Sequence, residues 1–203
     1  MRMSFFGTCV AGSILASTAV ACGTSTPSGG GSSGTGSASS GSTSDAGGSN
    51  SSSQAPPIGG TAVMAWLATG AYKNWHCEMN VHSARSPSPH SVDRVCSNDV
   101  IANNATGSGP WAKGAAAVKE LYATTTDATP GGYAVYLKTQ TDSAGGANWY
   151  FYGALTAGDT TVDGMGNDAM VMATCTGCHL AAGSDAAHTP SPGGRDEVYS
   201  PVH

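Results

Sequence analysis

The sequence predicts a folded domain of mixed helix and strand that starts near residue 60, and three observations carry this prediction. Residues 62–75 place apolar side chains at near-helical spacing. Two later segments, 132–139 and 148–155, are rich in aromatic and β-branched residues, as strands are. Residues 168–183 have a helical pattern that begins at Asp168, a residue type that caps helices.

The segments between these elements are less regular. Residues 76–104 are rich in Ser, Pro, His and Asn, which predicts a long loop. Residues 115–122 read A-A-A-V-K-E-L-Y, a composition that favours helix. Residues 143–147 contain glycine and predict the turn that joins the two strands. Alternation in the second strand divides its aromatic residues between two faces: Trp149 and Phe151 on one, Tyr150 and Tyr152 on the other.

The N-terminal part predicts export followed by a tether. Residues 1–21 carry one charge, Arg2, and an apolar run that ends in A-V-A, as in a signal peptide. Cys22 follows at the position that a lipoprotein signal peptidase leaves as the lipidated first residue, although an ordinary signal peptidase would also cut there. Residues 22–59 are nearly all small and polar and bury too little apolar surface to offset their ordering entropy. We therefore expect a signal peptide, then a disordered tether, then one folded domain over 60–203.

The sequence C-T-G-C-H at Cys175–His179 is the motif for covalent attachment of c-type haem. Two thiols one helical turn apart add to the two vinyl groups, and the adjacent imidazole binds the iron. The alternative is a C-x-x-C redox or zinc pair beside an incidental histidine, but zinc needs four ligands and no second C-x-x-C occurs. We expect one covalent haem c on Cys175 and Cys178, with His179 on the iron.

The other cysteines each have a separate role. Cys9 lies in the export segment and Cys22 is the lipidation site, which leaves Cys77 and Cys96. In an oxidising compartment these two are expected to form a disulfide, and closing that loop contributes about 3 kcal/mol. The alternative is a zinc cluster formed by both cysteines and the histidines His76, His82 and His90. The spacing of these residues fits no zinc template.

The position of the motif in the chain limits which residues could bind the iron on the side opposite His179. Only 24 residues follow His179, and none of them is methionine. The residues left as a sixth ligand are Met64, Met79, His188 and His203. With no obvious partner among them, a five-coordinate iron with an open distal side is the simplest expectation. An open position implies the binding or chemistry of a small molecule.

Four segments of the chain, taken in order, resemble one family. They are V-K-E-L-Y at 118–122, G-Y-A-V-Y-L-K-T at 132–139, N-W-Y-F-Y at 148–152 and C-T-G-C-H-L-A-A-G at 175–183. Together they are similar to the cytochrome P-460 family and to its sister group, the cytochromes c′-beta. The resemblance implies an α+β fold, a mainly antiparallel β-sheet with packed helices and a C-terminal haem-attachment helix. It also implies a strand at residues 115–122, His179 as proximal ligand and an open distal face.

The resemblance further implies a role for one lysine. The P-460 branch carries a lysine bonded to the haem macrocycle and oxidises hydroxylamine, whereas the c′-beta branch lacks the bond and binds nitric oxide or carbon monoxide. The matching residue is Lys119, the candidate catalytic and cofactor-binding lysine. On a strand it shares an apolar, inward face with Ala117 and Leu121; the alternative is a lysine at the sheet rim with its charge in water. Its rival, Lys138, precedes polar residues and is expected at a strand end.

Two classes of function stay open. One is an oxidoreductase that acts on hydroxylamine or a similar small nitrogen compound and passes electrons to a periplasmic carrier. The other is a non-enzymatic diatomic-gas binder or electron-transfer cytochrome. Glu120 is expected on the face opposite Lys119, so the sequence identifies no carboxylate that would accept protons from hydroxylamine. In both cases we expect a membrane-anchored lipoprotein facing the periplasm or cell surface, attached by its lipid alone.

The charge balance narrows the set of partners. The formal net charge of -5 argues against nucleic acid and against a basic patch that binds anionic lipid. The expected partners are therefore a small nitrogen-containing ligand or diatomic gas and an electron acceptor. A homodimer is compatible with all of these features.

Overall fold

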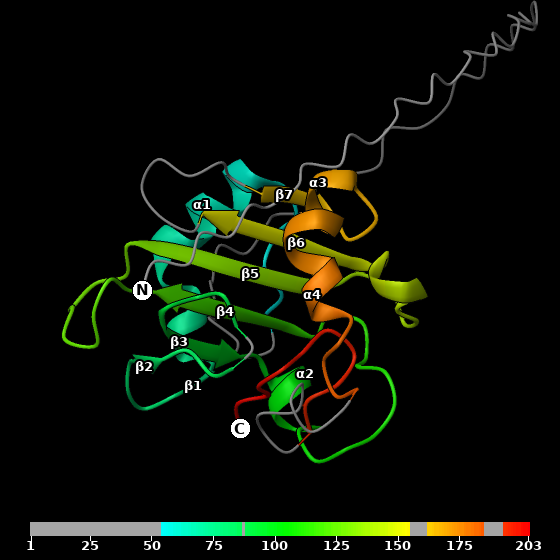
Figure 1. Ribbon diagram of the computed structural model, residues 1–203, viewed down its shortest axis with the longest axis horizontal. Coiled ribbons are helices and arrows are strands. Elements are labelled where there is room, and N and C mark those ends of the chain that lie inside the picture. The colour runs from blue at the N-terminus through cyan, green and yellow to red at the C-terminus, as the bar shows by residue number, and fades with distance from the viewer. Residues whose placement is uncertain (1–53, 87, 155–161, 185–192) are drawn as a thin grey trace, which may run out of the picture. The chain divides into compact units, whose positions relative to one another are not determined.

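The computed structural model of the protein describes residues 54–86, 88–154, 162–184 and 193–203. Within these residues the chain forms a seven-stranded antiparallel sheet of order β1-β3-β4-β5-β6-β7, with β2 also paired to β3 (Figure 1). The strands are β1 (His76–Cys77), β2 (His82–Ser83), β3 (Val92–Ser97), β4 (Ala116–Leu121), β5 (Gly132–Lys138), β6 (Trp149–Ala154) and β7 (Val162–Met165). The domain is therefore α+β, with the antiparallel sheet as its larger part.

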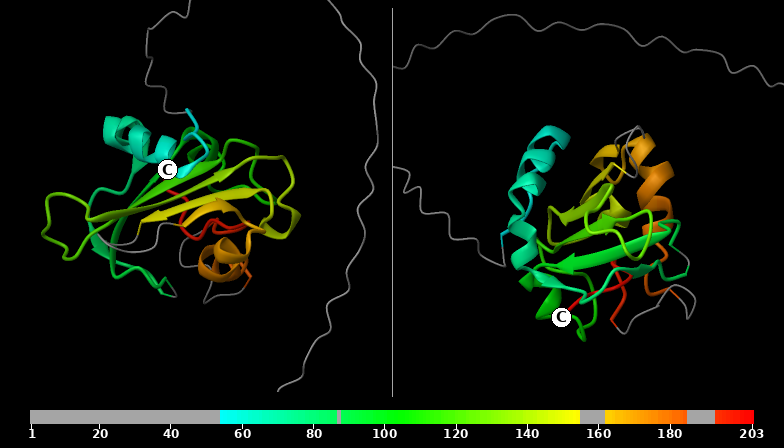
Figure 2. Two further views of the ribbon diagram at one scale, coloured as in Figure 1. Left: turned by 90° about the horizontal axis from the view of Figure 1, so that it is seen from above. Right: turned by 90° about the vertical axis from the view of Figure 1, so that its left-hand side faces the viewer.

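Short helices complete the domain. They are α1 (Gly60–Thr69), η1 (Ala71–Asn74), α2 (Asp99–Ala102), η2 (Ala144–Gly146), and the consecutive α3 (Ala169–Val171), η3 (Met172–Thr176) and α4 (Gly177–His179). α1 covers one face of the sheet and the α3–η3–α4 helix covers the other (Figure 2). No helix among the described residues is long and apolar enough to cross a membrane. The predicted signal peptide, Cys22, most of the tether and His188 lie outside the described residues.

The helix predicted over 62–75 is divided at Gly70. This glycine has φ 70°, a left-handed conformation that costs most other residues energy, and its N–H caps α1 by donating to the carbonyl of Leu67. The chain then forms the short 3₁₀ helix η1, in which Tyr72 is buried. The predicted element is present, but it is two short helices rather than one.

The sheet is buried on both faces, and each face has its own core. One core lies under α1 and includes Tyr150 and Tyr152; the other lies under the motif helix and includes Trp149 and Phe151. The alternation predicted for β6 is therefore confirmed. At residues 115–122 the strand implied by the family resemblance is confirmed, and the helix favoured by composition is wrong. β4 is a central strand hydrogen-bonded to β3 and β5, and such tertiary pairing outweighs helix propensity.

The prediction of a long loop over 76–104 is also wrong, because this segment contains β1, β2, β3 and α2. Two of its strands have only two residues each, and β3 reads V-D-R-V-C-S without a strict alternation of polar and apolar residues, so none of them gives a strand signal. Cys77 and Cys96 face each other across the β1–β3 pairing and form a disulfide with an S–S distance of 2.05 Å. The zinc alternative is therefore wrong, since both sulfurs are bonded to each other. His76 instead pairs with Asp99 at 2.9 Å.

Glu120 of β4 links η1 to β3 and to the residue that follows β4. Its carboxylate accepts hydrogen bonds from the hydroxyls of Tyr72 (2.5 Å) and Tyr122 (2.8 Å) and from Nε of Arg94 (2.7 Å). The residue is 1% exposed, so burial opposes its ionisation, but the three donors outweigh burial and lower its pKa. Glu120 thus belongs to the scaffold and lies on the face opposite Lys119.

We expect Glu120→Ala to lower the free energy of unfolding by about 3 kcal/mol, because it removes a buried partner from one cation and two hydroxyls. Because the folded pKa of Glu120 is lowered, its contribution is complete at neutral pH and is lost as pH falls through that pKa. Urea denaturation at neutral and acidic pH measures both effects. A loss below about 1 kcal/mol at neutral pH would contradict this role.

Candidate functional site

The C-x-x-C-H motif lies on the continuous α3–η3–α4 helix. Asp168 stands at the N-terminal boundary of the helix, and its carboxylate accepts a hydrogen bond from the N–H of Met165 at 2.7 Å. The helix includes the π turn η3, which ends with the first two residues of the motif, and such turns are common at functional sites. Cys175 and Cys178 follow one turn apart, both as free thiols, the first half-buried and the second exposed. Burial raises the pKa of the Cys175 thiol to about 11.

His179 is held in one orientation by three aromatic rings and one hydrogen bond. Its ring packs edge-on against Tyr136, Phe151 and Tyr199, with centroids 5.4–5.6 Å away. Its Nδ1–H donates to the backbone carbonyl of Glu197 at 2.5 Å, which selects the tautomer whose Nε2 carries a lone pair. Burial lowers the pKa of His179 to about 4, with a smaller contribution from the charge of Lys119. The residue is therefore a neutral imidazole with one free ligand atom.

The carbonyl that orients His179 comes from a C-terminal segment that is tied to the rest of the domain. Asp196 accepts hydrogen bonds from Lys138 Nζ (2.6 Å), from the Trp111 N–H (2.7 Å) and from the hydroxyl of Ser143. Arg195 stacks over the Trp111 ring at 3.5 Å. Lys138 is indeed the last residue of β5, as expected, but it is fully buried rather than near solvent. It acts as the internal counter-charge of Asp196.

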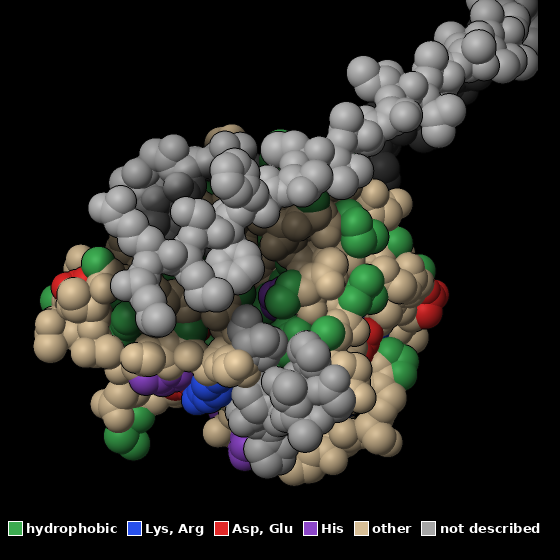
Figure 3. Space-filling model, viewed as in Figure 1, with side chains coloured by type: hydrophobic (Ala, Val, Ile, Leu, Met, Phe, Trp, Pro, Cys, Tyr) green, Lys and Arg blue, Asp and Glu red, His purple; other side chains and the backbone are tan. Residues whose placement is uncertain are grey.

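A cavity opens between the motif helix and the sheet. Its floor is one row across the sheet, because Lys119 of β4 pairs with Ala134 of β5 and Ala134 pairs with Gly153 of β6. Two members of this row have almost no side chain, which leaves space beside His179. The motif helix forms one wall, with Cys175, Cys178 and His179 among its lining residues. Figure 3 views this face and shows hydrophobic side chains around its centre, with histidine and basic side chains together beside them.

Lys119 lies in the middle of the sheet and not at a rim. Its side chain is 18% exposed, and its Nζ lies 3.0 Å from Oδ2 of Asp93 and 3.5 Å from the hydroxyl of Ser88. Asp93 is 2% exposed and lines the same cavity, and its Oδ1 has no hydrogen-bond partner among the described residues. The cavity is therefore lined by a buried carboxylate next to the lysine, and one oxygen of this carboxylate accepts no hydrogen bond from the described residues.

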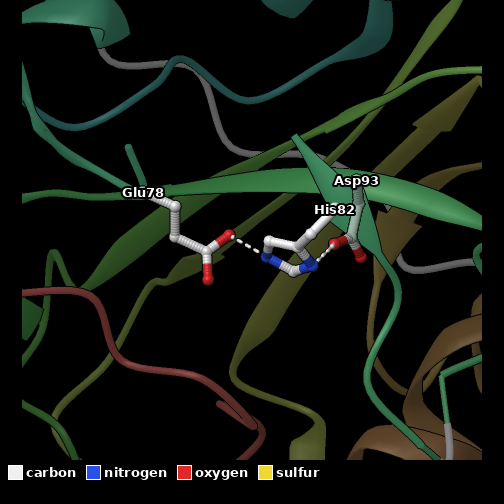
Figure 4. Close-up of side chains that lie close together, drawn as sticks. All are labelled: Glu78, His82 and Asp93. Carbon is white, nitrogen blue, oxygen red and sulfur yellow. Dashed lines mark hydrogen bonds and ion pairs between the residues drawn. The ribbon is translucent and has the colours of Figure 1, made fainter. Parts of the chain in front are cut away.

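Asp93 belongs to a series of ion pairs in which His82 lies between Asp93 and Glu78 (Figure 4). His82 Nδ1 lies 3.6 Å from Asp93 Oδ1, and His82 Nε2 lies 2.9 Å from Glu78 Oε2. These three residues are close enough to hold a metal ion. However, Arg85 and Lys119 already neutralise the two carboxylates, at 2.6 and 3.0 Å. As arranged, the group is an ion-pair network that holds Asp93 in position.

The structure brings together Lys119 and the three motif residues, all of which the sequence singled out. Of the other proposed iron ligands, the three that the structure describes do not line the cavity: Met64 is 59% exposed, Met79 is 91% exposed, and His203 is exposed. Two cavity residues were missed as site residues, His90 and Asp93. Both lie in the segment taken for a loop. Recognising that residues 92–97 form a strand would have placed Asp93 on the face of Val95 and Lys119.

The residues of the cavity fit a covalently attached haem. Two free thiols stand one turn apart, the adjacent imidazole presents an unused Nε2, and its Nδ1 has the carbonyl partner that metal-bound histidines generally have. The neighbouring floor combines small residues with the aromatic rings of Tyr136 and Phe151. Comparisons of the chain with family models, with curated proteins and with solved structures found no match.

The two sheet lysines are expected to differ in their effect on stability. Lys138→Met leaves Asp196 buried without its cation, so we expect the free energy of unfolding to fall by about 3 kcal/mol or more. Lys119→Met leaves Asp93 beside His82, and we expect a loss of about half that size or less. Urea denaturation of both variants tests this difference. Equal losses, or no partial recovery in Lys138→Met combined with Asp196→Asn, would show that Lys138 is not the counter-charge of Asp196.

Proposed function

We propose that the protein is an exported c-type haem protein of the cytochrome P-460 kind, with haem bound by Cys175 and Cys178 and the iron bound by His179. The single observation that carries the proposal is that the motif and Lys119, which are distant in sequence, line one cavity. A zinc or redox C-x-x-C pair would require neither the oriented imidazole nor the lysine.

The reaction that these residues favour is oxidation of hydroxylamine or a similar small nitrogen compound. When bound, the haem supplies an iron that binds such a molecule and accepts its electrons. The chain's own contribution is to orient the imidazole through the Glu197 carbonyl and to exclude water with Tyr136 and Phe151. Asp93 is the candidate proton acceptor that the sequence alone did not identify, because it lines the cavity and its Oδ1 accepts no hydrogen bond from the described residues; its nearest partner is His82 Nδ1 at 3.6 Å.

One observation favours the second candidate, a gas-binding or electron-transfer cytochrome. Lys119 Nζ forms an ion pair with Asp93 at 3.0 Å, and a protonated amine is not a nucleophile. A chain in which this pair persists would keep an ordinary haem without a bond to lysine. Both candidates share the expected export, the lipid anchor at Cys22 and a periplasmic electron partner or small ligand.

The absorption spectrum of the purified ferrous protein tests the proposal, because a haem bonded to lysine and an ordinary c-type haem absorb at different wavelengths. We expect a modified spectrum in the wild type, together with hydroxylamine-dependent reduction of an artificial electron acceptor. Lys119→Ala should restore an ordinary c-type spectrum and lose that reduction.

The matched control is Lys113→Ala, which removes an exposed lysine outside the cavity. This variant should keep the wild-type spectrum and turnover. An ordinary c-type spectrum without turnover in the wild type would replace the oxidase with the gas-binding or electron-transfer cytochrome. A wild-type spectrum in Lys119→Ala would show that the bond to lysine does not form.

A further inference from the structure

His90 lies in the loop between β2 and β3 and lines the same cavity as His179. Sequence reasoning considered it only as a zinc ligand beside two cysteines, which the disulfide excludes. Its backbone N–H donates to the hydroxyl of Ser88 at 3.3 Å, which fixes the loop locally. The His90 ring makes no hydrogen bond within the described part of the chain, so both of its nitrogens are unengaged.

The order of the strands places the two histidines on different walls. β4 and its Lys119 lie between β3 on one side and β5, β6 and β7 on the other. His179 packs on Tyr136 of β5 and Phe151 of β6, whereas the loop that carries His90 leads directly into β3. Figure 1 shows the motif helix and the β2–β3 segment over different parts of the sheet. Arg85, Ser86 and Ser88–His90 therefore form the wall of the cavity on the β3 side, across β4 from His179.

The chemistry of that wall leaves one suitable ligand. Arg85 is engaged with Glu78 at 2.6 Å, and the remaining polar lining residues, Ser86 and Ser88, offer only hydroxyls, which are weak ligands for haem iron. His90 is the one imidazole besides His179 among the described residues that line the cavity, and imidazole nitrogens are common ligands for iron.

We infer that His90 is the second axial ligand of the iron in the resting protein, opposite His179, and that an external ligand must displace it. This inference rests on the proposed haem and differs from the five-coordinate iron expected from the sequence. It adds a control on binding, because a small molecule gains access only in the fraction of molecules in which His90 is detached. The apparent affinity for such a molecule is reduced by that fraction.

The spin state of the ferric iron tests the inference without reference to activity. We expect a low-spin electron paramagnetic resonance spectrum for the wild type at neutral pH. His90→Gln should become high-spin, and added imidazole should restore the low-spin signal. The same variant should bind imidazole at least about tenfold more tightly than the wild type. His76→Gln, which changes an exposed histidine outside the cavity, should behave as the wild type.

Intact mass separates this inference from the proposed function. A wild type with one covalent haem and a high-spin signal overturns His90 ligation but leaves the haem site in place. A low-spin signal that survives in His90→Gln also overturns it. A wild type without covalent haem overturns both. If His90→Gln loses haem, His90→Met, which supplies another axial ligand, should retain haem in a low-spin state, and a high-spin signal in that variant contradicts the inference.

Discussion

The hydrogen bond from Nδ1 of His179 to the carbonyl of Glu197 is the contact on which the site depends. It links the motif helix to the C-terminal segment, and it leaves Nε2 as the one nitrogen able to bind a metal. The carbonyl reaches this position because Asp196 and Glu197 adopt positive φ values of 45° and 71°, a conformation that costs residues other than glycine energy. The ion pair with Lys138 and the stacking of Arg195 on Trp111 hold the segment there.

The two faces of the sheet differ in role: the face under α1 stabilises the fold, and the face under the motif helix lines the cavity. The face under α1 contains the buried carboxylate of Glu120, which is satisfied by three donors inside the protein and therefore has no capacity left for a ligand. The face under the motif helix contains Asp93, whose Oδ1 accepts no hydrogen bond from the described residues, and small residues at Ala134 and Gly153. A buried carboxylate oxygen without a hydrogen-bond partner is costly, so its presence beside the cavity is a feature that a binding site would explain.

Much of this arrangement was predictable where the signal is local. The motif, the helix that carries it and the alternation of β6 follow from spacing within a few residues. The β4 strand does not follow from composition, because its Ala-rich sequence favours helix; the family resemblance implied the strand, and pairing with β3 and β5 forms it. The roles of His90, Asp93 and Lys138 could not be deduced from their neighbours, because each depends on a contact with a residue at least 26 positions away or on a cavity formed by several elements.

The central claim is that this cavity holds a haem attached to the motif helix and facing the β4 lysine. Proteolysis of the exported, haem-loaded protein followed by mass spectrometry of its peptides tests it most directly. The account predicts one haem on the peptide that contains Cys175, Cys178 and His179, joined through the same haem to the peptide that contains Lys119. Recovery of the motif peptide without haem, with Cys175 and Cys178 as free thiols, would contradict the account.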